Sequence, residues 1–482
     1  MIEPARPAVI REWPGAHWLV VATVSMGAFL GQLDASIVTL ALPTLQQEFN
    51  TSLAAVEWVA LSYLLVLVAT VTAVGRLADM IGRKLLYTYG FALFTLASIG
   101  CGLSPSLGVL IGFRVVQAVG AAMLQANSVA LIATAVARTS LGRAIGIQGA
   151  AQAVGLALGP TVGGLLISLA GWRWIFFVNV PVGIVGIVLG ILLLPRSRHL
   201  APRVPFDWAG FWSFGPAVIL FMLALSLAGS NGLTSPVLLL VLLGAAAALF
   251  ALFLRLERRA PDPMIDLRLF RRRSFSTAIA AGLLSYLILF AVLFLVPFFL
   301  EHVRHLTPVQ AGAVLSVMPI ALGITAPFAG RARDRFGARI PTVAGMLLTA
   351  VCLLALTLTA DNQTALVVLL AGIGVGLGAF TPANNAAIMA AAPAQQSGMA
   401  GGILNLTRGL GTSLGVAIVG LILGLQTSQN TSASASAVTT GFQTSTAVLA
   451  LLALVAAALA WRRDPPAKAA GTPTNTPPEP AV

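Results

Sequence analysis

The chain has 482 residues, of which 58% are hydrophobic and only 9% are Asp, Glu, Lys or Arg, whereas a soluble globular protein carries about 25% of these charged residues. This composition excludes a water-soluble fold. The net charge of +13 would point to nucleic acid in a soluble chain, so the positions of the charges have to decide its meaning. The two cysteines lie in apolar runs and the four histidines lack metal-ligand spacing, so we expect no disulfide framework, metal or cofactor.

Apolar runs long enough to cross a bilayer as helices recur along the whole chain. They are too long and too uniformly apolar for the strands of a membrane barrel. The sequence therefore predicts an all-α polytopic membrane protein with fourteen transmembrane helices. The predicted spans are 18–42, 54–75, 85–103, 107–134, 142–168, 173–194, 208–229, 236–256, 276–300, 309–330, 341–360, 365–391, 399–426 and 443–461.

The basic residues follow this topology. With the N-terminus inside, 24 of the 28 Lys and Arg residues fall in cytoplasmic segments, two in outer loops and two within helices. This asymmetry is the positive-inside pattern, and it predicts a multi-pass protein of the cell (inner or plasma) membrane with both termini cytoplasmic. We interpret the dense arginine stretch at 255–273 as topological anchoring rather than a lipid-headgroup site. The partner that the charge indicates is the lipid bilayer, not nucleic acid.

The chain contains an internal repeat. The segment GRLADMIGRK at 75–84 is matched by GRARDRFGAR at 330–339, and each copy follows the second helix of a six-helix set. Parallel halves of this kind are typical of transporters that rock around a midplane site. The predicted units are a six-helix half at 1–195, two linker helices with a basic loop at 196–275, a second six-helix half at 276–462, and a disordered cytoplasmic tail at 463–482.

These segments resemble the major facilitator superfamily, and within it the 14-span drug:proton antiporters (multidrug efflux transporters). The match rests on GRLADMIGRK, on LDASIVTLALP at 33–43, on RVVQAVGAA at 114–122 and on GLALGPTVGG at 155–164. Ala118 stands where the family commonly has glycine. WRWIFFVNVPVG at 172–183 adds a further likeness to the 14-span group.

Asp34 is the first candidate for chemistry, because it lies deep in the first helix, about 24 Å along its axis. An acid at that depth is a functional candidate by default. We expect it to bind the coupling proton, a cationic substrate, or each in turn; the alternative is a structural acid paired with a neighbour. Arg114 lies at a compatible depth in the fourth helix. The resemblance implies that Arg114 influences protonation of this acid; the alternative is a fixed ion pair.

Further polar residues are candidates for the lining of a wet cavity. Gln117 and Gln125 follow Arg114 on roughly the same helix face. In the second half, Asn405 and Arg408 follow a helical spacing, and they either line the cavity or hydrogen-bond between helices.

Two motifs predict helix contacts. Gly155, Gly159 and Gly163 recur every four residues, followed by Gly164, and such small residues allow another helix to approach closely. Pro160 predicts a kink in the same helix. The resemblance implies that this contact seals the cavity between the halves and accompanies antiport.

The loop motif lies near the inner surface and comprises Gly75, Arg76, Asp79, Gly82 and Arg83. Asp79 can accept from a helix N-terminus or pair with Arg76 or Arg83. The resemblance implies that such a contact gates the inner side. The alternative is an exposed charge that only shapes a turn.

The predicted function is secondary active transport: proton-coupled export of amphipathic or cationic small molecules (multidrug efflux) by alternating access, by a protein that we expect to be a monomer. An ATP-driven pump would need a phosphate-cradling loop with its lysine, and Lys84 and Lys468 do not fit one. The sequence shows neither a nucleophile paired with a base nor histidines at metal-ligand spacing, so it does not indicate an enzyme. The alternatives are an exporter or proton-linked importer of one metabolite, and a flippase or sensor without ion coupling.

Overall fold

A computed structural model describes residues 6–7, 13–51, 53–137, 139–197, 206–229, 235–260, 263–306, 308–359, 362–393, 396–427 and 435–462. The predicted tail at 463–482 lies outside the described residues, as do parts of the linker segment. Every regular element in the described part is helical, as the hydropathy predicts. The first half contains α2 (Ala16–Glu48), α3 (Leu53–Ile81), α4 (Arg83–Gly102), α5 (Leu107–Ala135), α6 (Leu141–Ala170), α7 (Trp174–Phe177) and α8 (Asn179–Leu193).

The remaining helices form the inserted pair and the second half. The inserted pair is α9 (Trp208–Gly229) and α10 (Pro236–Glu257), followed by the short 3-10 helix η1 (Leu267–Arg271). The second half contains α11 (Arg273–His302), α12 (Pro308–Phe336), α13 (Arg339–Thr359), α14 (Gln363–Ala391), α15 (Ser397–Thr427) and α16 (Ala435–Trp461).

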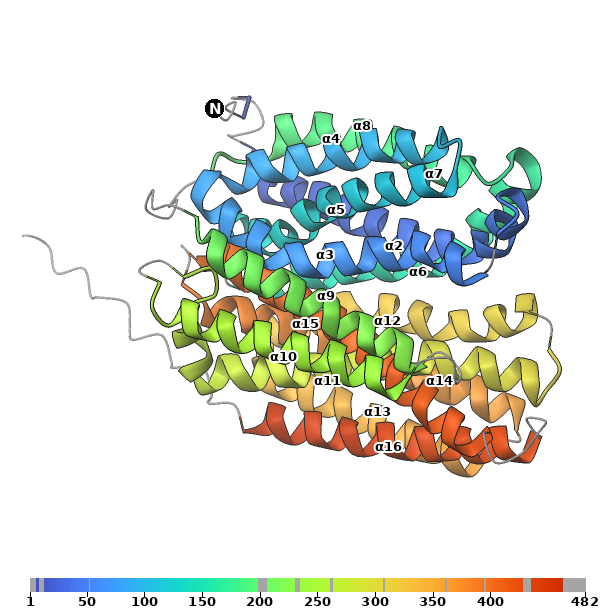
Figure 1. Cartoon of the computed structure of the whole chain (residues 1–482). Coiled ribbons are helices and arrows are strands. Elements are labelled where there is room, and N and C mark those ends of the chain that lie inside the picture. Colours follow the sequence, from blue (N-terminus) through green and yellow to red (C-terminus); the bar gives the residue numbers. More distant parts are fainter. Residues whose placement is uncertain are drawn as a thin grey trace, which may run out of the picture.

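The two halves lie side by side as separate bundles, with α2–α8 above and α11–α16 below in Figure 1. The inserted helices pack on the flank, where α9 contacts α3 of the first half and α15 of the second. The main contacts between the halves are those of α6 with α12 and of α3 with α15. This arrangement confirms the prediction of two six-helix halves joined by two extra helices.

The helices confirm the predicted number of spans. Among the described residues, thirteen helical spans are long and apolar enough to cross a membrane, with α7 and α8 together forming one of them, and the bent α6 makes fourteen. The two parts of α6, Leu141–Gly159 and Thr161–Ala170, differ in direction by 43°. The bend falls at residue 160, where a proline removes one backbone hydrogen bond, as the sequence predicts.

Glycine contacts hold the halves together at the end that carries the two repeated loops. Gly142 in α6 packs directly on Gly330 in α12, and a Cβ on either residue would overlap the other backbone. Gly75 in α3 and Gly398 in α15 make the equivalent contact across the other pair of helices. Because glycine has no side chain, the helix backbones can approach this closely.

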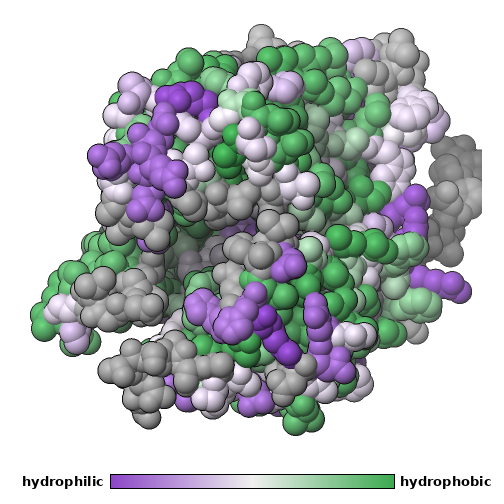
Figure 2. All heavy atoms as spheres, turned by 90° about the vertical axis from the view of Figure 1, so that its right-hand side faces the viewer, coloured by the Kyte–Doolittle hydropathy of each residue, from purple (hydrophilic) through white to green (hydrophobic). Residues whose placement is uncertain are grey.

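The opposite end of the molecule is hollowed between the halves, as Figure 2 shows from that side. Residues of α6 such as Val154, Leu158 and Thr161 face Ser316 and Ile320 of α12 across an open space. The structure is therefore closed at the end of the repeated loops and open at the other end.

Gly155 offers a test of packing within the first half. An ideal Cβ at Gly155 would lie 2.6 Å from the Phe29 carbonyl oxygen in α2, which is backbone and cannot turn aside. We expect Gly155→Ala to lower the stability by about 1–3 kcal/mol, the usual cost of overpacking. The measurement is the thermal unfolding temperature of the purified protein in detergent.

Gly112→Ala in α5 is the matched control, because nothing lies within 4 Å of its ideal Cβ. Replacing this helical glycine by alanine should leave the unfolding temperature unchanged or raise it. Equal melting temperatures for the two variants would contradict the tight α2–α6 contact.

Candidate functional site

Asp34 lies at the centre of a buried polar network in the first half. Its side chain is fully buried in α2 and accepts three hydrogen bonds from two other helices. Arg114 in α5 donates through a terminal nitrogen (NH1) to Oδ2 at 2.7 Å. Gln117 Nε2 and Asn179 Nδ2 donate to Oδ1 at 3.0 and 2.8 Å. Both oxygens of this carboxylate are thus occupied by protein donors.

Arg114 is fixed from several sides and is only 1% exposed. Its Nε donates to the Val59 carbonyl of α3 at 3.0 Å, and NH1 also donates to Gln117 Oε1 at 2.6 Å. The guanidinium lies 4.1 Å from the centre of the Tyr63 ring. Removing one partner of a buried ion pair of this kind typically costs about 3–5 kcal/mol, because the other charge remains buried. The network therefore ties α2, α3, α5 and α8 together.

The structure corrects one expectation about this network. We expected the Arg114 and Gln117 stripe to face a wet cavity, but both side chains point into the interior of the first bundle, where Gln117 also donates to Ser98 Oγ at 2.8 Å. The compatible depths of Asp34 and Arg114 are confirmed by their contact. Sequence reasoning missed Asn179 as a third partner; the available signal was an asparagine inside the apolar segment at 172–183.

Asp79 bridges the two halves at the closed end. It is 1% exposed, and its Oδ1 and Oδ2 accept from the backbone N–H groups of Gly398 and Met399, each at 2.9 Å. These groups belong to the first turn of α15, where unpaired N–H groups and the helix dipole favour an anion. Arg83 also donates to Asp79 Oδ1, at 2.9 and 2.6 Å. An exposed charge that merely shapes a turn is excluded.

The second copy of the loop motif, at 330–339, makes the equivalent contact in the opposite direction. Asp334 Oδ1 and Oδ2 accept from the backbone N–H groups of Gly142 and Arg143 at 2.8 and 2.9 Å, in the first turn of α6. Arg333 lies 3.0 Å from the same carboxylate. Each half therefore places one carboxylate on a helix N-terminus of the other half. The sequence repeat predicted two equivalent loops but not which helices they would touch.

The other residues of the first loop motif shape this contact. Gly82 lies between α3 and α4 with φ of 129°, a backbone conformation that glycine adopts without strain. Arg76 is buried, and it belongs to the same turn of α3 as Asp79. Lys84 Nζ donates to the carbonyls of Ile191 and Leu194 at 2.7 and 2.8 Å, at the C-terminal end of α8.

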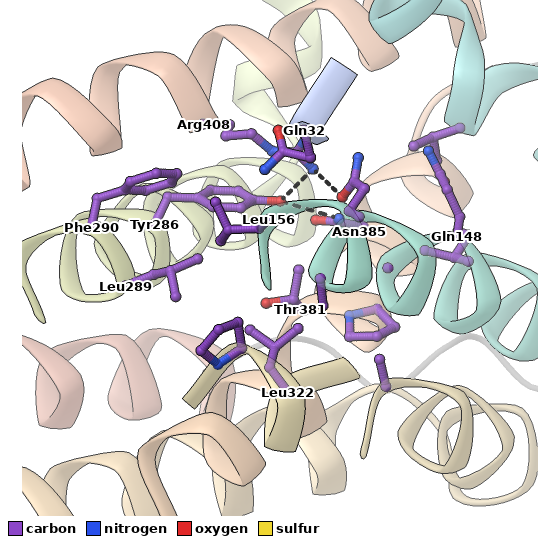
Figure 3. Close-up of a pocket in the computed structure, with 18 residues that line it drawn as sticks. Gln32, Gln148, Leu156, Tyr286, Leu289, Phe290, Leu322, Thr381, Asn385 and Arg408 are labelled. Atoms are coloured by element: carbon purple, nitrogen blue, oxygen red, sulfur yellow. Dashed lines mark hydrogen bonds between the residues drawn. The ribbon is translucent and has the colours of Figure 1, made fainter. Parts of the chain in front are cut away.

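A central cavity lies between the halves, on the open side of these contacts (Figure 3). It encloses about 730 Å³ of space not filled by protein atoms, and this figure includes space that is open to solvent. Its described lining comes from α2, α5 and α6 of the first half and from α11, α12, α14 and α15 of the second. Its polar lining residues are Gln32, Gln148, Gln152, Tyr286, Thr381, Asn385 and Arg408, and the rest are apolar or glycine.

Arg408 crosses from the second half to the first within this cavity. One of its terminal nitrogens (NH2) donates to Gln152 Oε1 at 3.0 Å and to the Tyr286 hydroxyl at 3.3 Å, while Asn385 Nδ2 donates to the same hydroxyl (Figure 3). Sequence reasoning placed Arg408 at the cavity but missed Gln152 and Tyr286. The signal for Gln152 was a polar side chain in the middle of an otherwise apolar span.

Two other expected cavity residues lie elsewhere. Asn405 is buried, and its Nδ2 donates to the Gln125 carbonyl at 2.9 Å and to the Gly401 carbonyl at 2.9 Å. Neither Asn405 nor Gln125 belongs to the described lining of the cavity. The pair instead links α15 to α5, which was the second of the two roles that the sequence left open for Asn405.

The glycine motif of α6 also differs from expectation. A Cβ on Gly155 or Gly159 would meet α2, in the same half, at Phe29 and Ser36 respectively. Gly163 is buried and Gly164 is exposed. The close contact between α6 and the other half lies further toward the repeated loops, at Gly142 and at Gly146, which packs on Ala326. The motif thus sets the position of α2 rather than the seal between the halves.

Among the described residues, no group of three His, Cys, Asp or Glu side chains is placed to hold a metal ion.

Comparison with known proteins identifies the family. The sequence model of the Major Facilitator Superfamily matches residues 24–207 and 278–481, that is, both halves without the inserted helices. The chain belongs to this superfamily. Its members are transporters, in agreement with a central cavity between two helical halves.

Several curated relatives match over most of their length. The chain is 36% identical to the riboflavin transporter RibZ of Clostridioides difficile, over 82% of this chain and 86% of that protein. It is 38% identical to the multidrug resistance protein Stp of Mycobacterium tuberculosis, over 82% of this chain and 73% of that protein. It is 34% identical to the tetracenomycin C resistance and export protein of Streptomyces glaucescens, over 81% of this chain and 72% of that protein. The names of Stp and of the tetracenomycin C protein confirm the resemblance to drug efflux transporters.

A solved structure supports the fold alone. The human organic anion transporter MFSD10 (TETRAN) superposes with a TM-score of 0.66 at 15% sequence identity, covering 93% of this chain and 100% of that chain.

The two capping carboxylates generate a prediction. We expect Asp79→Asn and Asp334→Asn each to open the closed end more often, because a charged acceptor on a helix N-terminus is worth about 1–2 kcal/mol. The measurement is labelling of an Ala326→Cys probe by a membrane-impermeant thiol reagent applied from the side of the repeated loops. Each substitution should raise the labelling rate about fivefold or more.

Glu48→Gln is the control, because Glu48 is a half-exposed carboxylate whose ion-pair partner, Arg173, belongs to the same half. The same vesicles without the probe report the background from the buried Cys101 and Cys352. Unchanged labelling in both aspartate variants would show that these contacts do not keep the end closed.

Proposed function

We propose that this protein is a proton-coupled exporter of amphipathic small molecules that works by alternating access. In this proposal it is a monomer of the cell membrane with both termini cytoplasmic, and its partners are the substrate, protons and lipid, with no nucleic acid. The observation that carries the proposal is that α2 bears both a cavity residue, Gln32, and the buried acid Asp34. One helix thus takes part in both the proton site and the substrate site.

The geometry of α2 explains how the two sites can be coupled. Positions i and i+2 of a helix point in nearly opposite directions, so Gln32 faces the cavity while Asp34 faces α5 and α8. Gly155 and Gly159 hold α2 tightly against α6, which carries Gln148 and Gln152 of the cavity wall. A rotation or shift of α2 would therefore be transmitted to the substrate site.

Protonation of Asp34 supplies the driving event in this proposal. A neutral Asp34 cannot balance the charge of Arg114, which would remain buried among α2, α3 and α5. That imbalance disfavours the present packing of α2 and favours the alternative state. With the repeated loops in the cytoplasm, the present structure is the outward-facing state, and release of Asp79 and Asp334 from the helix N-termini would open the inner side.

The relatives support export but leave a second candidate. The names of Stp and of the tetracenomycin C protein specify resistance and export. The name of RibZ, which is 36% identical, specifies transport of one metabolite, riboflavin. Transport of a single metabolite, either as an exporter or as a proton-linked importer, is therefore the second candidate function.

Inside-out vesicles distinguish these functions. We expect an imposed pH gradient, acid inside, to drive accumulation of a fluorescent amphipathic dye in vesicles that contain the protein, and dye addition to dissipate part of the gradient. Vesicles without the protein are the control. Accumulation of riboflavin but of no dye would favour the single-metabolite transporter, and transport of dye without proton flux would refute proton coupling.

Asp34 and Arg114 provide a charge-balance test. We expect Asp34→Asn to abolish gradient-driven transport and to lower stability by about 3–5 kcal/mol, because Arg114 is left unpaired. The double variant Asp34→Asn/Arg114→Gln removes both charges and should regain most of the thermal stability without regaining coupling. The measurements are vesicle transport and the unfolding temperature.

Arg114→Lys keeps the charge but loses the fixed fork of donors to Asp34, Val59 and Gln117. It should shift the pH dependence of transport while leaving substrate binding in place. Full proton-driven transport by Asp34→Asn at normal expression would overturn the role given to this acid.

A further inference from the structure

We infer that the central cavity selects amphipathic aromatic anions and discriminates against cations, with Arg408 as the residue that recognises the anionic group. This inference rests on the proposed function, because it takes the central cavity to be the substrate site. It narrows the substrate class and reverses the sequence-based expectation that the substrates include cations.

The described lining of the cavity carries a positive charge. Arg408 is the one charged residue among the described residues that line it, and these include no Asp or Glu. Asp34, the acid deepest in the membrane part of the first half, does not belong to this lining, and both of its oxygens already accept from Arg114, Gln117 and Asn179. A cation in the cavity would meet a like charge and no carboxylate, whereas an anion would meet a counter-ion in a medium of low dielectric constant.

Acceptors in the described structure satisfy the Arg408 guanidinium only in part. Gln152 and Tyr286 hold its NH2 group, and the guanidinium lies 5.1 Å from the centre of the Tyr286 ring. Its Nε is buried and has no hydrogen-bond partner within the described structure. A buried N–H left without an acceptor is unfavourable. An incoming carboxylate or phenolate oxygen would supply the missing acceptor as a charge-assisted hydrogen bond.

The cavity wall around Arg408 is largely aromatic and aliphatic. Tyr286 and Phe290 of α11 lie beside Arg408, and Leu156 and Leu322 face them from the first half and from α12 (Figure 3). Aromatic and aliphatic surfaces of this kind bury a flat ring system, while amide groups such as that of the partly buried Gln32 fix its orientation. Together the three features describe a site for a planar apolar body with a negative group at one edge.

Two dyes with one molecular frame test the inference. Fluorescein is anionic and rhodamine 123 is cationic at pH 8, and both carry the same xanthene ring system. We expect the purified full-length protein in nanodiscs of zwitterionic lipid to bind fluorescein at least about tenfold more tightly than rhodamine 123, measured by fluorescence anisotropy without any ion gradient. Empty nanodiscs of the same lipid report partitioning into the bilayer.

Variants assign the selectivity to Arg408. We expect Arg408→Gln to weaken fluorescein binding about tenfold or more, the factor that one charge-assisted hydrogen bond provides. Gln152→Glu has nearly the same shape and places a carboxylate against the Arg408 guanidinium, so it should also weaken fluorescein binding and reduce the preference over rhodamine 123. Arg271→Gln, an exposed arginine of η1 outside the cavity lining, makes the same charge change and should leave both affinities unchanged.

Three outcomes would overturn the inference. The first is that rhodamine 123 binds as tightly as fluorescein, and the second is that the folded protein, verified by its thermal unfolding transition, binds neither dye measurably. The third is that Arg408→Gln leaves the ratio of the two dye affinities unchanged. Because these measurements use no gradient, they are independent of proton coupling. Gradient-driven export of a cation would refute the anion site while supporting the proposed export function. Anion binding without transport would support the anion site while refuting the export function.

Discussion

The carboxylates of Asp79 and Asp334 hold the two halves of this protein together at one end. Each accepts two backbone hydrogen bonds from the first turn of a helix in the opposite half. The glycine contacts beside them bring the helices close enough for these bonds to form. Polar contacts of this kind can be broken and remade at moderate cost, whereas a large apolar seal could not be. The closed end is therefore suited to opening and closing, and the cavity exists because the halves meet there and separate beyond it.

The charges within the membrane divide into two groups with different surroundings. Asp34 and Arg114 are paired and enclosed inside one half, so that changing either charge strains the packing of its helices. Arg408 lies between the halves, where its neighbours in the described cavity lining are neutral and one of its N–H groups has no acceptor among the described residues. In the proposed mechanism, the first group senses the proton and the second meets the ligand. Helix α2 connects them because it contributes to both.

The sequence singled out charged residues deep in the apolar spans, but it did not predict the directions in which their side chains point. Asp34, Arg114 and Arg408 stand out because a charge inside a long apolar run is rare and costly. Their surroundings were not predictable in the same way. Gln117 and Gln125 share a helix with Arg114, yet whether that face meets a cavity depends on which helices pack on it. Asn179, which completes the Asp34 network, is 145 residues away along the chain, so no local pattern connects the two.

The sequence by itself determined the number and length of the spans, the repeat of two halves and the kink in α6. Lipid cannot hydrogen-bond the backbone, so a long apolar run has to be a helix, and proline has to interrupt one. Only the tertiary structure decided which end is closed, which helices Asp79 and Asp334 cap, and that the described cavity lining carries a positive charge without an acid. Those features depend on how each helix is rotated about its axis and paired with distant neighbours, and hydropathy constrains neither.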